Sequence, residues 1–389
     1  MYPTMEDIRK IAAKGQYKRV PVCRELYADR YTPVEMMRTL REASRHCYLL
    51  ESASQTEVWG RYSFLGYEPV MEITCTDGIM KIRRTEGADK EEITKQVAHP
   101  GDTLREILKE YKSPVMEDMP PFTGGLVGYF SYDYIKYSEP KLKLGEHEDP
   151  DFRDMDLMLF DQVIAFDHYR QKVLLITGVM LDDLENSLRK AEQKLQEMAD
   201  LIRSGKKAEF PPLQLDSEIR PQFPKEKYCQ MVEKAKHYIH EGDIFQVVLS
   251  NPMRAKAEGS LFDTYRVLRA TNPSPYMFYF SSDDIELAGA SPETLVKLEN
   301  KKLTTFPLAG TRPRGKTKQE DRELEEGLLK DEKELAEHNM LVDLGRNDVG
   351  RVCDFGSVKV SDYKAIKRFS HVMHITSKVT GQLSADKDA

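Results

Sequence analysis

Short runs of apolar, β-branched and aromatic residues, separated by turn residues, constrain the fold of this chain most. Such runs over residues 59–84, 156–168 and 172–181 fit strands, the first of them joined in hairpins with Asp77-Gly78 as a typical turn. Apolar residues at helical spacing lie between the strand-like runs, as in residues 33–45. Thr32 followed by Pro33 is a typical helix start there, and Gly242 is the predicted stop of an amphipathic helix over residues 228–241. Strands in hairpins with helices inserted between them predict an α+β fold with mostly antiparallel sheets, rather than a doubly wound parallel sheet.

Glycines within the strand-like runs suggest different local structures. Gly60 and Gly66 are interpreted as turns between strands. Gly128 lies in an aromatic run without the Lys-Ser/Thr of a phosphate loop, so we expect it to permit close backbone packing. The apolar run over residues 244–253 is predicted to be a further strand.

Length and composition limit the classes of protein to which this chain can belong. Its 389 residues suffice for one large domain or two of ordinary size. Residues 204–225 contain four prolines and little periodicity, so we expect a boundary there that divides residues 1–220 from 221–389. The net charge of −7, without a basic block, argues against nucleic acid as a partner.

Membrane insertion and export are not expected. No apolar run approaches the length of a membrane span, and the N-terminus is charged where a signal peptide would be apolar. The five cysteines are scattered and contain no CxxC motif, which is typical of reduced thiols in a cytoplasmic protein.

The stretch from residue 330 to residue 351 reads as a helix that carries acidic side chains. Asp331 is a suitable N-cap with Glu334 three residues later, and Gly345 stands where a left-handed C′ residue is expected. Glu334, Glu337 and His338 share one helix face, and carboxylate oxygens suit a hard cation such as Mg²⁺. Spacing alone also fits a simpler interpretation, in which Glu334 only caps the helix and Glu337 is only solvated.

Eight motifs, spread over most of the chain, occur in one order. They are LLES at 49–52, GRYSFLG at 60–66, GDIFQVVLS at 242–250, NPSPYMFY at 272–279, GASPE at 289–293, PLAGTRPRG at 307–315, DEKELAEHNMLVDLGRNDVGR at 331–351 and SHVMH at 370–374. Together they resemble the large subunits of anthranilate synthase, within the family of chorismate-using enzymes.

The resemblance implies a fold, a substrate and a set of catalytic residues. The expected fold has two large, mostly antiparallel sheets wrapped by helices, and the expected substrate is chorismate. Glu337 is implied as a Mg²⁺ ligand, with Glu334 lining the same site. Glu293 is implied as the general acid that protonates the departing C4 hydroxyl, and His374 as a histidine near the substrate ring.

Two positions indicate which nucleophile enters. Gln246 stands where water-adding relatives carry a lysine base, and a neutral amide cannot deprotonate water. Ala309, beside Gly310 and Thr311, stands where aminodeoxychorismate synthases typically carry a lysine nucleophile. Both positions favour attack by ammonia to give anthranilate and pyruvate. The sequence shows no amidotransferase Cys-His site, so the resemblance implies a separate subunit that hydrolyses glutamine.

The resemblance also implies feedback inhibition by tryptophan. Glu51 and Ser52 of LLES, together with Pro275, Tyr276 and Met277, match the family's tryptophan site. A carboxylate for the ammonium group and an apolar wall for the indole are suitable chemistry for this ligand. The part over residues 1–220 would carry the first half of this site, and residues 221–389 would form a partial chorismate-binding domain.

The family normally continues beyond the point at which this chain ends. The continuation carries a second glutamate ligand for Mg²⁺ and a segment that holds a substrate carboxylate, so we expect a C-terminally truncated chain that is inactive alone or is completed in trans. Two other functions stay open at this stage. One is that of aminodeoxychorismate synthase component I, and the other is that of a catalytically silent tryptophan-binding fragment.

Overall fold

The computed structural model describes residues 1–52, 60–85, 91–139, 141–142, 152–369 and 371–388. All ladders between its named strands are antiparallel, and helices pack against the sheets, which confirms the α+β class. Within these ranges the larger sheets number three, one of seven strands and two of five, rather than the expected two.

The seven-stranded sheet, called the large sheet here, takes its strands from both halves of the chain. Its fifth and sixth strands, β2 and β15, pair along Met277 and Glu51, so the large sheet crosses the predicted boundary at 220/221. In order, its strands are β1 (Arg19–Tyr27), β10 (Lys172–Met180), β9 (Val163–Asp167), β3 (Tyr62–Tyr67), β2 (Cys47–Glu51), β15 (Tyr276–Ser281) and β16 (Glu286–Ser291).

Helices cover the large sheet and bury its apolar residues. Thr32 caps α2 as its spacing predicts, because its hydroxyl accepts a hydrogen bond from the Glu35 amide. None of the helices in the described ranges combines the length and the apolar composition that a bilayer crossing requires. The helices whose side chains enter this core are α1 (Met5–Ala12), α2 (Pro33–Ala43), α4 (Leu184–Ser204) and α6 (Phe262–Thr271).

Two sharp corners separate a five-stranded sheet from the large sheet. Between β3 and β4 the chain turns at Glu68, whose φ of 49° lies in the left-handed region, and between β8 and β9 it turns at Asp161. These corners explain why the first half of the chain forms two sheets. The N-terminal five-stranded sheet contains β6 (Glu92–Gln96), β5 (Ile79–Arg84), β4 (Met71–Thr76), β8 (Met155–Phe160) and β7 (Gly125–Phe130), and α3 (Pro100–Glu110) and the 3₁₀ helix η1 (Tyr132–Tyr137) pack on it.

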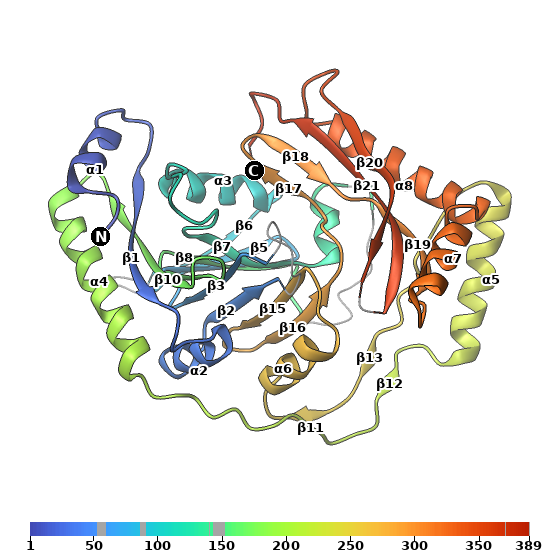
Figure 1. The fold of residues 1–389 in the computed structure, drawn as a ribbon, viewed down its shortest axis with the longest axis horizontal. Helices are drawn as coiled ribbons and strands as arrows, with labels where there is room; N and C mark the ends of the chain where they lie inside the picture. Colours follow the sequence, from blue (N-terminus) through green and yellow to red (C-terminus); the bar gives the residue numbers. More distant parts are fainter. Residues whose placement is uncertain (53–59, 86–90, 140, 143–151, 370, 389) are drawn as a thin grey trace.

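The last third of the chain forms a second five-stranded sheet, called the C-terminal sheet, with two helices on one face (Figure 1). Its longest strand, β21, pairs with β18 and β19 along one edge and with β20 along the other. The elements are β17 (Lys297–Glu299), β18 (Lys302–Thr305), β19 (Leu308–Pro313), β20 (Lys359–Arg368), β21 (Val372–Gln382), α7 (Lys318–Leu328) and α8 (Glu332–Gly350).

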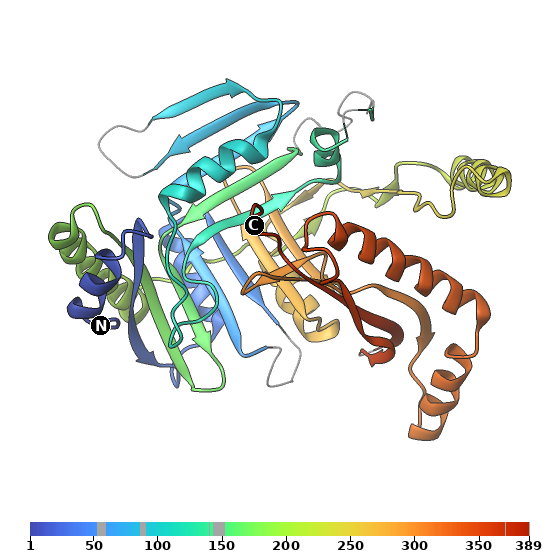
Figure 2. The same ribbon diagram turned by 90° about the horizontal axis from the view of Figure 1, so that it is seen from above.

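A long arm joins the two halves and ends in a helix without buried residues (Figure 2). Gly242 ends this helix in the left-handed conformation, with a φ of 84°, which confirms the predicted stop. Two short ribbons form the stem of the arm: β11 (Gln214–Leu215) pairs with β14 (Ala257–Glu258), β12 (Arg220–Pro221) pairs with β13 (Met253–Arg254), and α5 (Lys225–Glu241) lies beyond them.

Three local predictions were wrong. Gly66 lies inside β3 and not in a turn, because a Cβ there would stand 2.3 Å from the Tyr48 ring. Gly345 does not end α8, which continues to Gly350, and its missing side chain instead lets the helix approach Thr305. Residues 244–252 form no strand, because no described sheet edge lies alongside them, and Phe245 is 87% exposed.

Gly128 provides a test of the close packing that was expected for it. A Cβ at this position would lie 2.0 Å from the carbonyl oxygen of Asp156 on β8, so the Gly128→Ala variant must distort the β7–β8 pairing. We expect it to lose about 1–3 kcal/mol of unfolding free energy, measured by urea denaturation. Gly327→Ala, on an open helical position, is the control and should be neutral or stabilising by up to about 1 kcal/mol. Equal stability of the two variants would contradict this packing.

Candidate active site

The strand β21 presents different side chains to the two faces of the C-terminal sheet. Met373 and Ile375 are fully buried against α7 and α8, together with Val379. Since side chains alternate along a strand, His374 and Thr376 point to the opposite face, which helices leave open. This open face is where the predicted catalytic residues gather.

A β-bulge in β19 places Thr311 against His374. The register between β19 and β21 shifts between Ala309 and Thr311, and Gly310 takes a φ of 71° that suits glycine. The His374 Nδ1 atom lies 3.0 Å from the Thr311 hydroxyl and 3.2 Å from the Gly310 carbonyl oxygen. Ala309 is buried and offers only its methyl group, as its identity predicts.

Glu293 follows β16 and lies close enough to His374 for the two charges to interact. Burial raises the pKa of the Glu293 carboxyl, and the positive field of His374 partly opposes this rise. Glu293 also lines a cavity of about 50 Å³ together with Tyr276 and Lys367. The structure therefore brings together Glu293, His374, Thr311 and Gly310, all of which were predicted from sequence.

The predicted acidic face of α8 divides into two environments. Asp331 caps the helix as expected, because its carboxylate accepts from the amides of residues 333 and 334. His338 is fully buried, and its Nε2 atom lies 2.7 Å from the Ser377 hydroxyl. Burial lowers the pKa of His338, so its ring is neutral, and the Ser377 hydroxyl contacts Nε2 inside the core between α8 and β21.

The two glutamates of α8 that were predicted for the magnesium site have different partners. Arg312, on β19, lies 2.7 Å from Asp331 and 3.6 Å from a Glu334 carboxylate oxygen. The Glu337 carboxylate accepts a long hydrogen bond of 3.4 Å from the Gln246 side-chain amide and has no ion pair with any described residue. Carboxylate oxygens suit Mg²⁺, which commonly keeps several waters and needs only one or two protein ligands. The donor chemistry of Glu337 thus fits this ion, whereas Arg312 already neutralises Glu334.

The predicted tryptophan residues lie where β2 ends beside β15. Glu51 is 7% exposed, and its carboxylate accepts from Arg269 at 2.8 and 3.1 Å and from the Tyr265 hydroxyl at 2.7 Å. Glu51 is therefore already ion-paired rather than free for an ammonium group. The Ser52 hydroxyl next to it is buried and has no hydrogen-bond partner among the described residues.

The three remaining predicted residues lie on the segment that enters β15. Pro275 and Tyr276 line the same cavity as Glu293, whereas Met277 is buried in the large sheet. The Tyr276 hydroxyl contacts the Thr294 hydroxyl, one residue beyond Glu293. The segment predicted to bind tryptophan thus contacts the residue that follows Glu293.

Sequence reasoning missed the cations that hold these acidic groups. Arg269 and Arg312 lie on α6 and β19, far along the chain from Glu51 and adjacent to no acidic motif. A buried carboxylate indicates that some cation must pair with it, but it does not indicate which one.

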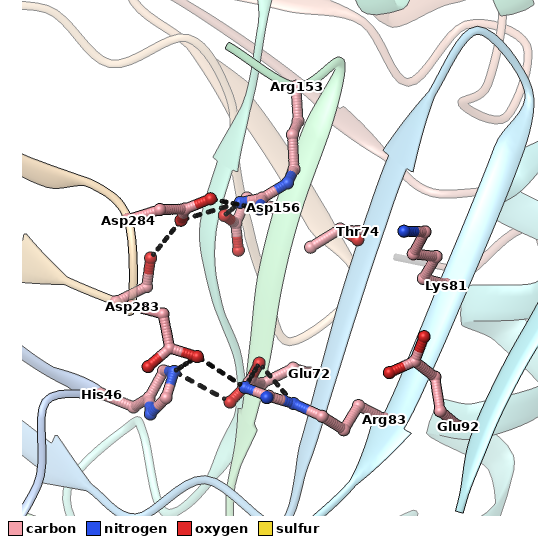
Figure 3. A pocket seen from close by; sticks show the side chains of 11 residues that line it. His46, Glu72, Thr74, Lys81, Arg83, Glu92, Arg153, Asp156, Asp283 and Asp284 are labelled. Carbon is pink, nitrogen blue, oxygen red and sulfur yellow. Dashed lines mark hydrogen bonds and ion pairs between the residues drawn. The ribbon is translucent and has the colours of Figure 1, made fainter. Parts of the chain in front are cut away.

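A second polar cavity, of about 250 Å³, lies between the large sheet and the N-terminal five-stranded sheet (Figure 3). In it the His46 Nε2 atom lies 3.0 Å from Glu72 and 3.4 Å from Asp283, and the hydrogen bond with Glu72 raises the pKa of His46. Arg83 pairs with the same two carboxylates. Cationic side chains therefore already balance this cluster, and it holds the β15–β16 hairpin against β4.

Comparison with known proteins agrees with this arrangement. The family model of the chorismate binding enzyme matches residues 10–389. Anthranilate synthase component 1 of Acetivibrio thermocellus is 39% identical over 99% of this chain and 78% of its own length, and that of Aquifex aeolicus is 38% identical with the same coverage. The crystal structure of anthranilate synthase component I from Streptococcus pneumoniae TIGR4 superposes with a TM-score of 0.71 and 34% identity, covering 84% of this chain and 70% of that one.

Motifs, fold and site geometry thus lead to one assignment. The match extends over nearly the whole chain, and it includes the segments that carry Glu293, Thr311, Glu337 and His374. The chain belongs to the chorismate-binding enzyme family, in which its relatives are the component 1 chains of anthranilate synthase.

Proposed function

We propose that this chain is the catalytic component of an enzyme that converts chorismate and ammonia to anthranilate, with release of pyruvate and water. The observation that carries the proposal is the placement of Glu293 beside His374 and Thr311 on the open face of the C-terminal sheet. The names of the relatives support the same reaction. Gln246 and Ala309 offer no lysine for water activation or for covalent attack, so ammonia is the nucleophile that this site suits.

Glu293 would act as the general acid. Hydroxide is a poor leaving group, so the C4 hydroxyl of chorismate must take up a proton as its bond to the ring breaks. A raised pKa increases the fraction of Glu293 that holds a proton at a given pH, and this is the state that an acid catalyst needs.

His374 would act as a proton acceptor next to the substrate ring. When the Nδ1 atom of His374 donates to the Gly310 carbonyl oxygen, which can only accept, Nε2 is the basic nitrogen of the ring. Loss of pyruvate from the aminated ring removes a ring proton, and a fixed basic nitrogen suits this step.

Glu337 would hold Mg²⁺, with Glu334 lining the same site. When bound, this ion neutralises a carboxylate of chorismate and fixes the ring. Ammonia would come from a glutamine-hydrolysing partner subunit. The five free cysteines fit a reducing compartment, and we place the protein in the cytoplasm.

Anthranilate fluorescence tests the reaction directly, with chorismate, ammonium and Mg²⁺ as reactants, using both the 389-residue chain and any longer product of the same gene. Formation of aminodeoxychorismate, detected by chromatography, would support the aminodeoxychorismate synthase alternative. Tryptophan binding without turnover by either form would support the silent fragment.

Removal of the Glu293 acid should affect turnover rather than folding. We expect Glu293→Gln to lower kcat by roughly 10²- to 10⁴-fold, since the amide cannot donate the proton. Glu299→Gln, at an exposed position of β17, is the matched control and should retain wild-type turnover. The role is refuted if the two variants have similar kcat values in the fluorescence assay.

The magnesium proposal predicts a change in metal requirement. We expect Glu337→Gln to raise the Mg²⁺ concentration for half-maximal activity by at least about tenfold, because a charged ligand is lost. Titration calorimetry with Mg²⁺ alone should show the same weakening. Glu332→Gln, in the exposed first turn of α8, is the control. An unchanged Mg²⁺ dependence in the Glu337 variant would remove this residue from the site.

We also propose that tryptophan binds at the end of β2, between Glu51, Ser52 and the segment of Pro275, Tyr276 and Met277. The buried Ser52 hydroxyl, which lacks a partner among the described residues, supports a ligand contact there. Since Arg269 already forms an ion pair with Glu51, a ligand ammonium would compete with this arginine and displace α6.

The Ser52→Ala variant separates ligand binding from stability. We expect the inhibition constant for tryptophan to rise by about three- to tenfold, the value of one hydrogen bond. The melting temperature should not fall, because the hydroxyl stabilises no described group. The exposed Ser361→Ala variant serves as a control. Unchanged inhibition would exclude the Ser52 contact.

A further inference from the structure

Lys367 stands beside the catalytic histidine, at a position that no motif singled out. It lies on β20, which forms the free edge of the C-terminal sheet, and it is the direct cross-strand partner of His374 on β21. Thr311 on β19 is the partner of His374 on its other side. Directly paired residues of antiparallel strands project to the same face, so Lys367, His374 and Thr311 form one row on the open face.

The Lys367 side chain reaches the cavity that Glu293 lines. This cavity of about 50 Å³ has Lys367 and Glu293 in its wall, together with Pro275 and Tyr276. A volume of this size holds a group of a few atoms, such as one carboxylate, and not a whole ring, since a single water in the liquid occupies about 30 Å³. The rest of a ligand would lie over His374 and Thr311.

The surroundings of Lys367 favour an anionic ligand. Its ammonium lies 5.3 Å from the centre of the Phe369 ring, whose edge in turn meets the His374 ring at a centroid distance of 5.5 Å. Desolvation lowers the pKa of Lys367, although the residue as a whole is exposed to solvent. An ammonium group in a cavity wall can pair with a carboxylate through a charge-assisted hydrogen bond.

The proposed reaction specifies which carboxylate comes near. If Glu293 protonates the C4 hydroxyl of chorismate, the neighbouring C3 substituent lies next to the same wall. That substituent is the enolpyruvyl group, which carries the second carboxylate of the substrate and leaves as pyruvate. We propose that Lys367 is a positioning residue that binds the enolpyruvyl carboxylate of chorismate, and this inference rests on the proposed function.

The test compares three variants by titration calorimetry in the presence of Mg²⁺. Lys367→Met should raise the chorismate dissociation constant by about ten- to a hundredfold, the effect of losing a charged hydrogen bond. Lys367→Arg keeps the charge and should remain within about threefold of the wild type. Lys359→Met, at the exposed start of β20, is the matched control and should bind as the wild type does. The melting temperature of each variant monitors folding.

Benzoate identifies the carboxylate, because it keeps the ring acid but lacks the enolpyruvyl group. Lys367→Met should bind benzoate as tightly as the wild type does while binding chorismate more weakly. Equal losses for both ligands would overturn the assignment to the enolpyruvyl group. Unchanged chorismate binding in Lys367→Met would overturn the inference and leave the proposed function standing.

Two further outcomes distinguish the inference about Lys367 from the proposals on tryptophan binding and on the reaction. If Lys367→Met weakens only tryptophan binding, the ammonium serves the inhibitor's carboxylate, and the inference is wrong. If the wild-type protein itself binds no chorismate, the proposed function fails, and the inference about Lys367 fails with it.

Discussion

The buried carboxylate of Glu51 is the interaction on which the two halves of the molecule depend. It lies at the end of β2, and Arg269 and Tyr265 of α6, over two hundred residues later, satisfy it. Burial of an unpaired carboxylate would cost several kcal/mol, so α6 must stay docked whenever β2 and β15 are paired. Because α6 leads directly into Pro275, Tyr276 and β15, this ion pair also sets the wall of the cavity beside Glu293.

If tryptophan binds at Glu51 as proposed above, this connection gives a physical route by which it would inhibit the proposed reaction at Glu293. A ligand that competes with Arg269 for Glu51 changes the position of α6, and Tyr276 contacts Thr294, which follows the catalytic carboxyl. Coupling between two ligands is reciprocal, so chorismate bound near Glu293 must weaken tryptophan binding by the same factor. The two sites need no long pathway, since both use the same β15–β16 hairpin.

Local sequence signals predicted the ends of several helices. The roles of two glycines, in contrast, depend on segments that come close to them only in the folded chain. Thr32 and Asp331 cap their helices, and Gly242 ends α5, because each effect depends only on the nearest backbone groups. Gly66 and Gly345 were misread as turns or stops, because Tyr48 and Thr305, which come close to them, belong to other segments. In the site, motif residues such as Glu293 and His374 were predicted, but Arg269, Arg312 and Lys367 have no local signature, because strand pairing and helix docking bring them there.

The contact between Gln246 and Glu337 would link the choice of nucleophile to the charge of the proposed magnesium site. Gln246 comes from the arm and Glu337 from α8. The partner at 3.4 Å is a neutral amide, and the carboxylate has no cationic partner among the described residues. A lysine at position 246 would place an ammonium against Glu337 and would neutralise it, as Arg312 neutralises Glu334. In the proposed reaction a neutral amide would thus serve two purposes: it provides no base for water, and it leaves the negative charge of Glu337 available for a divalent cation.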